Sequence, residues 1–144
     1  MDEDIANRVR RLSAEELEEL AYCWVLYANK KQLPPDGDWT TWLLIGGRGS
    51  GKTRAGAEWV RQQAADGIGP IAVVGQTMTD AIAVMVRGES GILRVTPPDQ
   101  QPRLIGAALR WPNGVEGRVL SASDPDGFRG PQFAAAWCDE ICKW

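Results

Sequence analysis

The sequence predicts an α/β domain built around a phosphate-binding loop, with a mostly parallel central sheet flanked by helices. Residues 46–53 fit the loop pattern G-x-x-x-x-G-K-[ST]. Short apolar runs alternate with helical segments, which is typical of a parallel sheet. A last apolar run ends in two adjacent carboxylates, Asp139 and Glu140. Together these observations indicate a nucleotide-binding α/β fold.

Each residue type in the loop has a chemical role. Glycines let the backbone fold tightly, so that consecutive N–H groups point inward at phosphate oxygens. Lys52 is expected to contact the β- and γ-phosphates of ATP, and the Thr53 hydroxyl is expected to bind Mg²⁺. Arg48 either reaches the γ-phosphate or meets solvent. The predicted nucleotide-binding residues are Gly46, Gly47, Arg48, Gly49, Ser50, Gly51, Lys52 and Thr53.

The segments on either side of the loop are predicted to be a strand and a helix. Trp42–Ile45 is expected to be a short buried strand that enters the loop. Thr53–Ala65 is expected to be the helix that leaves it, with its positive N-terminus directed at the phosphates. Ile71–Gly75 is a second predicted buried strand, and a helix over Ala81–Val86, capped by Thr79 or Asp80, follows it.

Residues 1–35 are predicted to form a helical lead-in that precedes the main domain, residues 36–144. Ser13 and Glu16 have the spacing of a capping box, which opens a helix expected to run to about Asn29. Apolar residues recur along it at helical spacing: Leu17, Leu20, Trp24 and Tyr27. We expect this stripe to dock on the core; a partner-binding face is the alternative.

The third quarter of the chain predicts an inserted β-hairpin. Leu104–Trp111 and Val115–Ser121 flank a turn at Pro112–Gly114, which contains Asn-Gly. The hairpin is expected to be an antiparallel addition at the edge or on a face of the sheet.

Phe133–Cys138 followed by Asp139 and Glu140 has the form of a Walker B element. A buried strand delivers carboxylates to the edge of the sheet where ligands bind. Asp139 is expected to hold Mg²⁺, and Glu140 to orient the attacking water or accept its proton. Asp139 lies 86 residues after Thr53 (139 − 53), which leaves room for intervening strands. The two motifs predict a P-loop NTPase of the ASCE/RecA-like type that hydrolyses ATP.

Composition narrows the other possibilities. The chain has 144 residues, a net charge of −3, no histidine and three cysteines. The length suits one domain, the charge gives no basic footprint for nucleic acid, and histidine-based catalysis is excluded. Three cysteines, Cys23, Cys138 and Cys142, are too few for a disulfide framework, so a reducing, cytoplasmic setting is expected. No apolar run has the length of a membrane span, and no membrane partner is predicted.

The glycine-rich loop, the Asp139-Glu140 pair and the stretches around them resemble the large terminase subunit of tailed bacteriophages and gene transfer agents. The likeness covers Gln32–Trp39, Trp42–Val60, Trp111–Gly114, Arg129–Glu140 and Lys143–Trp144. It implies a motor ATPase that drives double-stranded DNA into a procapsid. Partners implied by the resemblance are a portal, a small terminase subunit and further copies of the chain in a ring.

The resemblance also implies roles for single residues. Arg48 matches an arginine inside the Walker A loop, and Glu140 matches the catalytic glutamate. Arg129 matches a position implicated in arginine fingers that act on a neighbouring subunit, although a solvated or salt-bridged Arg129 is an equal expectation from its exposed loop. The region around Gln32 and Trp39 corresponds to the part that reads adenine.

Relatives of this kind continue past Walker B with a coupling motif, further strands and a nuclease domain, whereas this sequence ends four residues after Glu140. We therefore expect an incomplete sheet and poor ATP hydrolysis by the chain alone, as in a fragment, split gene or remnant. The alternatives are another phosphate-loop ATPase or kinase, and a nucleotide-binding module without catalysis.

Overall fold

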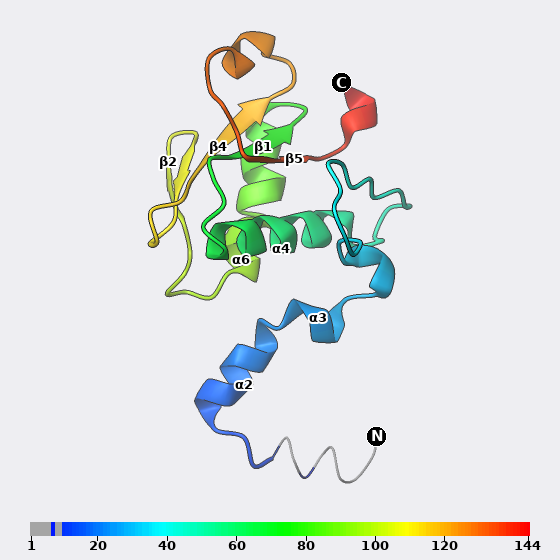
Figure 1. Ribbon diagram of the computed structural model, residues 1–144, viewed down its shortest axis with the longest axis vertical. Helices are drawn as coiled ribbons and strands as arrows, with labels where there is room; N and C mark the ends of the chain where they lie inside the picture. The colour runs from blue at the N-terminus through cyan, green and yellow to red at the C-terminus, as the bar shows by residue number, and fades with distance from the viewer. Residues whose placement is uncertain (1–6, 8–9) are drawn as a thin grey trace.

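The computed structural model describes residue 7 and residues 10–144, which form an α/β domain with an N-terminal extension (Figure 1). In this part of the chain five strands form one sheet in the order β2-β3-β4-β1-β5. The strands are β1 (Ile71–Gly75), β2 (Arg103–Ile105), β3 (Ala108–Arg110), β4 (Glu116–Ser121) and β5 (Ala135–Cys138). The helices of the domain are α4 (Lys52–Ala65), α5 (Met78–Asp80), the π-helix η2 (Ala81–Val86), α6 (Ile92–Val95), η3 (Pro125–Phe128) and η4 (Ile141–Lys143).

The predicted α/β class is confirmed, but the sheet is mixed rather than mostly parallel. Strand β1 pairs in parallel with β4 on one side and with β5 on the other. Strands β2 and β3 add to the free side of β4 in antiparallel orientation. The predicted hairpin insertion therefore lies at the edge of the sheet. The three parallel strands end at a common edge, and β5 brings the Asp139-Glu140 pair there.

The first arm of the predicted hairpin is not a single strand. The chain reverses at Gly106, whose φ of 61° lies in the left-handed region, and this turn separates β2 from β3. Leu104 and Leu109 are therefore cross-strand partners in one small hairpin. The turn at Pro112–Gly114 then joins β3 to β4 as predicted, and Asn113 Oδ1 accepts a hydrogen bond from the Val115 N–H.

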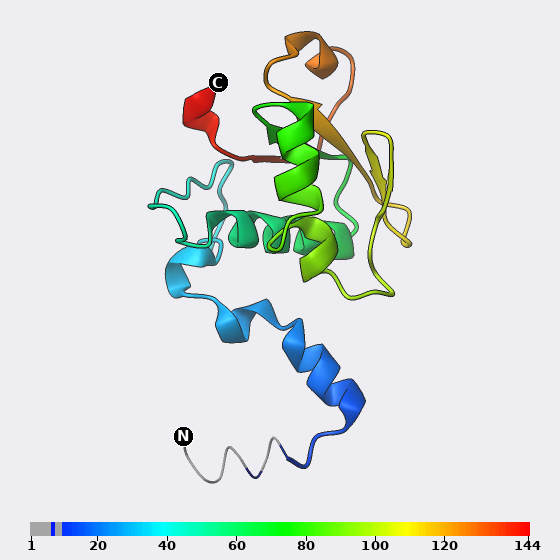
Figure 2. The ribbon, with the colours of Figure 1, turned by 180° about the vertical axis from the view of Figure 1, so that it is seen from behind.

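The helices that were predicted to flank the sheet lie against one of its faces. Figure 2 shows η2 in front of the strands, α4 crossing below them, and α6 in front of one end of α4. The buried core between these layers includes Val60, Val73, Met85, Ile92 and Val119. On the other face Ala72, Val74 and Leu120 are covered by the segment between β4 and β5, with Ala122 and Phe133 against them.

The helices predicted after the loop and after β1 are present, and each differs from its prediction at the N-terminal end. Helix α4 begins at Lys52, one residue before the predicted start, and ends at Ala65 as predicted. The segment after β1 is capped by Thr77, not by Thr79 or Asp80. The Thr77 side chain accepts a hydrogen bond from the Asp80 N–H at 3.1 Å. Thr77 has the extended backbone that an N-cap needs, whereas Asp80 is already helical.

Trp42–Ile45 does not form the predicted buried strand. Its backbone pairs with none of the five strands, and Leu43 and Ile45 are 66% and 86% exposed. A strand needs a neighbour that completes its hydrogen-bond ladder, and no described residue provides one at this position. This part of the chain is extended but unpaired.

The N-terminal lead-in differs from its prediction in length and in packing. The capping box at Ser13 is present, but α2 (Ala14–Ala21) ends well before Asn29, and a separate α3 (Trp24–Tyr27) follows it. Neither helix buries a residue, so the apolar stripe does not dock on the core. Within the lead-in, α2 extends away from the domain (Figure 1), while residues 1–6 and 8–9 lie outside the described residues. The division at residue 35 stays a prediction.

One close contact fixes the position of α4 against the sheet. Gly56, in the second turn of α4, faces the indole ring of Trp137 on β5, and a Cβ atom at this position would overlap the ring. Trp137 is 8% exposed. Because Gly56 has no side chain, the Trp137 ring lies directly against the α4 backbone, and α4 can approach the strand closely enough to bring its first turn near the end of β5.

Replacing Gly56 with alanine is expected to destabilise the domain, although alanine normally stabilises a helix interior by about 1 kcal/mol relative to glycine. Overpacking against Trp137 costs about 1–3 kcal/mol and should outweigh the helical gain. Chemical denaturation measures the free energy of unfolding. The double variant Gly56→Ala/Trp137→Phe should recover part of the loss, because the smaller ring leaves room for the methyl group. A more stable Gly56→Ala protein contradicts this role for the contact.

Candidate functional site: a glycine-rich loop beside the end of a strand

The glycine-rich loop (residues 46–53) leads directly into α4. Gly51 is the N-cap of α4 and has a φ of 79°, and Gly49 has a φ of 77°. Both values favour glycine, which explains the fixed glycine of the pattern at Gly51 and the glycine at the variable position 49. Lys52 Nζ donates hydrogen bonds to the carbonyl oxygens of Gly46 and Gly47, at 2.8 and 3.0 Å. The ammonium group therefore lies over the start of the loop.

Gln32, at the end of η1 (Lys30–Gln32), supports the loop from the lead-in. Its Nε2 donates a hydrogen bond to the Ser50 carbonyl oxygen at 2.9 Å, and its amide lies where a Cβ atom on Gly51 would lie. Sequence reasoning named Gln32 only through the resemblance and assigned no contact to it. A glutamine 18 residues before its partner carries no local signal for such a bond.

Three tryptophans hold the segment between η1 and the loop against α4. The ring centroid of Trp39 lies 6.3 Å from Trp42 and 6.3 Å from Trp59 of α4. A hollow of about 560 Å³ opens beside them, and its lining includes Lys30, Lys31 and Trp42. The segment that sequence reasoning assigned to adenine recognition thus borders a hollow with an aromatic ring and two cations.

The loop and the Asp139 carboxylate meet at the edge of the sheet. The Asp139 N–H donates to the Val74 carbonyl oxygen at 3.0 Å, which continues the pairing of β5 with β1. The Thr53 hydroxyl donates to Asp139 Oδ2 at 3.5 Å. Residues 86 positions apart are thus brought together by α4 and β5. Burial and the nearby Glu140 raise the pKa of Asp139, while Lys52 and the Thr53 hydroxyl oppose this shift.

Glu140 has an unusual backbone and no contact with the loop. Its φ of 53° makes it the one non-glycine residue with a left-handed backbone among those described. Such a conformation costs about 1–3 kcal/mol and is found most often at functional sites. The Glu140 carboxylate is half-exposed and forms an ion pair with Lys143 at 3.4 Å.

Neither of the two predicted catalytic arginines forms a hydrogen bond or ion pair with Thr53 or Asp139. Arg48 is exposed within the loop. Arg129 is 85% exposed and forms an ion pair with Asp126 at 3.3 Å, within its own loop. Of the two expectations for Arg129, the salt bridge is the one present in this structure.

The described residues contain neither a metal-binding cluster of side chains nor a membrane-spanning helix. No group of three or more cysteine, aspartate or glutamate side chains is arranged to hold a metal ion there. In residues 7 and 10–144 no helix has the length and apolar character needed to cross a membrane. A Mg²⁺ ion at the loop would therefore depend on Thr53, Asp139, phosphate oxygens and water rather than on a carboxylate cage.

Comparison with known proteins identifies the family. Residues 43–144 match a family model described as terminase large subunit, T4likevirus-type, N-terminal. The chain belongs to this family. No curated protein and no solved structure matches it. The resemblance noted in the sequence is thereby confirmed, and membership in the terminase family links the chain to phage DNA packaging.

In this terminase family member α4 also carries a buried charge. Glu58 is 3% exposed and lies between Arg54 and Arg61, at 2.7 and 3.1 Å. Arg54 extends from there over the ring of Trp24, 5.4 Å from its centroid, which links α4 to the lead-in. Burial raises the pKa of Glu58, and the two arginines only partly oppose this shift.

The raised pKa of Glu58 predicts a specific pH dependence of stability. The folded protein binds the Glu58 proton more tightly than the unfolded chain, so this group adds stability as the pH falls through its folded pKa toward its ordinary value of 4.5. The unfolding free energy of the wild type, minus that of Glu58→Gln, should therefore be larger at about pH 4 than at about pH 7. Denaturant titrations at both values measure it.

Glu116→Gln is the matched control for this measurement. Glu116 also pairs with an arginine, Arg110, at 3.4 Å, but both side chains are well exposed. An exposed ion pair contributes little to stability, so the Glu116→Gln difference from the wild type should be small at both pH values. The prediction is contradicted if the difference in unfolding free energy between the wild type and Glu58→Gln is the same at both pH values.

Proposed function

We propose that this chain has a P-loop NTPase fold of the ASCE/RecA-like type and binds ATP and Mg²⁺ at residues 46–53. We further propose that it hydrolyses ATP as the motor part of a phage-type terminase, which translocates double-stranded DNA into a procapsid. The observation that carries this proposal is the contact between Thr53 and Asp139, which joins the Walker A and Walker B sequences at one point. Family membership supports the choice of motor.

The residues at this point suit a magnesium nucleotide. The Thr53 hydroxyl and the Asp139 carboxylate are hard oxygen ligands of the kind that Mg²⁺ prefers, and they lie side by side. Bound Mg²⁺ would neutralise charge on the phosphates during transfer. Lys52 is proposed to exchange its bonds to Gly46 and Gly47 for phosphate oxygens. The N–H groups of the loop and the N-terminus of α4 favour the same anion.

Glu140 is the proposed group that orients water or accepts its proton. Its left-handed backbone at the end of β5 is the kind of strained position that functional sites use. To act, its carboxylate must leave Lys143. Arg48 is proposed to contact the γ-phosphate, and Arg129 to leave Asp126 and act on the nucleotide of a neighbouring subunit.

The proposed partners follow from the proposed motor. They are double-stranded DNA, a portal, a small terminase subunit and further copies of this chain in a ring. The proposed location is the cytoplasm of the bacterial host, where phage DNA is packaged.

A second candidate function is nucleotide binding without turnover. It is favoured by the exposed carboxylate of Glu140 and its ion pair with Lys143. It is also favoured by β5, which pairs with β1 alone among the described strands, so the backbone that positions Glu140 is supported from one side. The two candidates share Lys52 and Thr53 and differ at Glu140.

Replacing Lys52 with alanine should weaken ATP binding by more than tenfold, because the loop loses its contact with the β- and γ-phosphates. Isothermal titration with MgATP measures the affinity. Arg87→Ala, which removes an exposed cation outside the loop, should leave the affinity unchanged. Unchanged affinity in Lys52→Ala refutes a phosphate-binding role for residues 46–53.

Glu140→Gln should retain MgATP binding and lose at least 100-fold in steady-state hydrolysis, if Glu140 has the general-base role. Lys143→Ala should keep or raise the rate, since it frees the Glu140 carboxylate from its ion pair. Phosphate release in the presence of Mg²⁺, with EDTA as the metal-free control, measures the rate. Binding with no turnover in the wild type or in Lys143→Ala supports the second candidate instead.

A further inference from the structure

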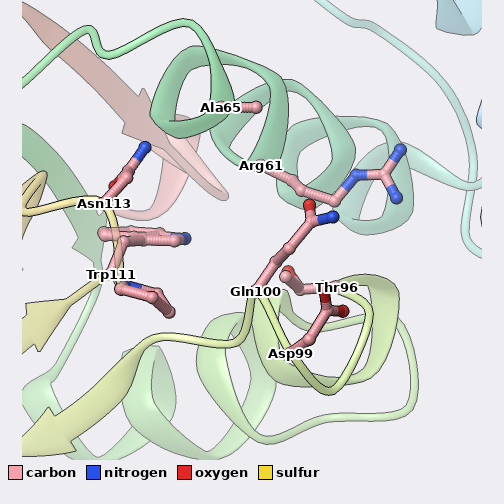
Figure 3. Close-up of a pocket in the computed structure, with 8 residues that line it drawn as sticks. Arg61, Ala65, Thr96, Asp99, Gln100, Trp111 and Asn113 are labelled. Atoms are coloured by element: carbon pink, nitrogen blue, oxygen red, sulfur yellow. The ribbon is translucent and has the colours of Figure 1, made fainter.

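A cavity lies at the opposite end of α4 from the glycine-rich loop. It has a volume of about 240 Å³ and lies between the last turns of α4, the segment after α6 and the turn that follows β3 (Figure 3). Its lining includes Arg61, Ala65, Asp99, Gln100, Trp111 and Pro112. Helix α4 rises about 1.5 Å per residue, so Ala65 is roughly 20 Å from Lys52. The cavity is therefore separate from the proposed nucleotide site.

Trp111 supplies the feature that points to a ligand. Its side chain is buried, with 6% of the residue exposed, and its Nε1–H has no hydrogen-bond partner. Figure 3 shows the indole nitrogen at the end of the ring that faces Gln100 and Arg61 across the cavity. Buried donors are almost always paired, because an unpaired donor keeps the full cost of its desolvation. An acceptor that enters the cavity from outside would remove this cost.

Two other polar side chains of the wall already have partners. Asn113 Nδ2 donates to the Ala64 carbonyl oxygen at 2.7 Å. Thr96 Oγ1 donates to the Ile92 carbonyl oxygen at 2.6 Å. The Trp111 N–H is therefore the buried donor in this wall that still needs an acceptor.

The charges around the cavity favour an uncharged ligand. The Arg61 guanidinium pairs at 3.1 Å with Glu58, a carboxylate that it shares with Arg54, and it donates to the Val95 carbonyl oxygen at 3.2 Å. Asp99 is exposed at the rim and places a negative charge there. A carboxylate or phosphate would be repelled by Asp99 without gaining a free cation. A neutral group that accepts from the indole and donates to Asp99 meets both needs.

We propose that this cavity is a binding site for an uncharged carboxamide carried on a flat apolar group. The carbonyl oxygen accepts from Trp111 Nε1–H, and the amide N–H donates to the Asp99 carboxylate. The apolar group packs against the Trp111 ring, Ala65 and Pro112. A volume of about 240 Å³ equals that of roughly eight water molecules, which is enough for one aromatic ring with an amide. The site is independent of ATP binding or hydrolysis.

Benzamide is the probe, and the reporter is the indole N–H resonance of Trp111 in ¹H–¹⁵N spectra of the whole chain. Trp111→Phe identifies that resonance by its loss, and the six other indole signals of the seven tryptophans report whether the variant stays folded. Benzamide should shift the Trp111 signal downfield in a saturable way. Binding to a folded Trp111→Phe, followed through the backbone amide signals of Thr96, Asp99 and Gln100, should weaken at least fivefold.

Matched ligands separate the proposed contacts. Benzoate, which has the same shape and a charge, should bind at least tenfold more weakly than benzamide, and Asp99→Asn should reduce that difference. Toluene should leave the Trp111 proton unshifted. Three outcomes overturn the proposal: no saturable shift with benzamide, an equal response to toluene, or unchanged benzamide affinity in folded Trp111→Phe. If the Trp111 N–H is bonded only to water, benzamide should give no saturable shift, which is the first of these outcomes.

Discussion

The contact between Gly56 and Trp137 is the constraint on which the rest of the structure depends. The Trp137 ring of β5 packs directly against the backbone of α4, because Gly56 has no side chain at that point. Because α4 carries the glycine-rich loop at its N-terminus and β5 ends in Asp139, this one approach fixes the relation between them. The 3.5 Å contact of Thr53 with Asp139 is a consequence of where the helix lies on the strand.

Lys52 has a structural role within the loop as well as its proposed chemical one. Its ammonium donates to the carbonyl oxygens of Gly46 and Gly47, while Gln32 of the lead-in donates to the Ser50 carbonyl oxygen. Side-chain donors, Lys52 Nζ and Gln32 Nε2, thus hold backbone carbonyl groups near both ends of the glycine-rich loop. A bound phosphate would compete with carbonyl oxygens for the lysine, so binding would exchange one set of acceptors for another.

The parts of the fold that the sequence predicted well are those set by local pattern. Helix α4 after the loop, the buried run Ile71–Gly75 and the Asn-Gly turn each follow from residues that lie close together. The failures depend on distant partners. Trp42–Ile45 has the composition of a strand but pairs with none of the described strands. The apolar stripe along α2 and α3 contains no buried residue. Likewise, nothing local indicated that Gln32 would reach Ser50, or that the Trp111 N–H would be left without an acceptor.

The two halves of the candidate site are supported to different degrees by the fold. Asp139 continues the pairing with β1, through its bond to the Val74 carbonyl, and it touches α4. Glu140 is one residue further, where the backbone turns into the left-handed region and the side chain pairs with Lys143. The proposed metal-binding half thus depends on contacts with β1 and α4, whereas the proposed hydrolytic half depends on a strand end with a neighbour on one side. If the site acts as proposed, nucleotide binding requires only the first half, and turnover requires that the end of β5 be held in place as well.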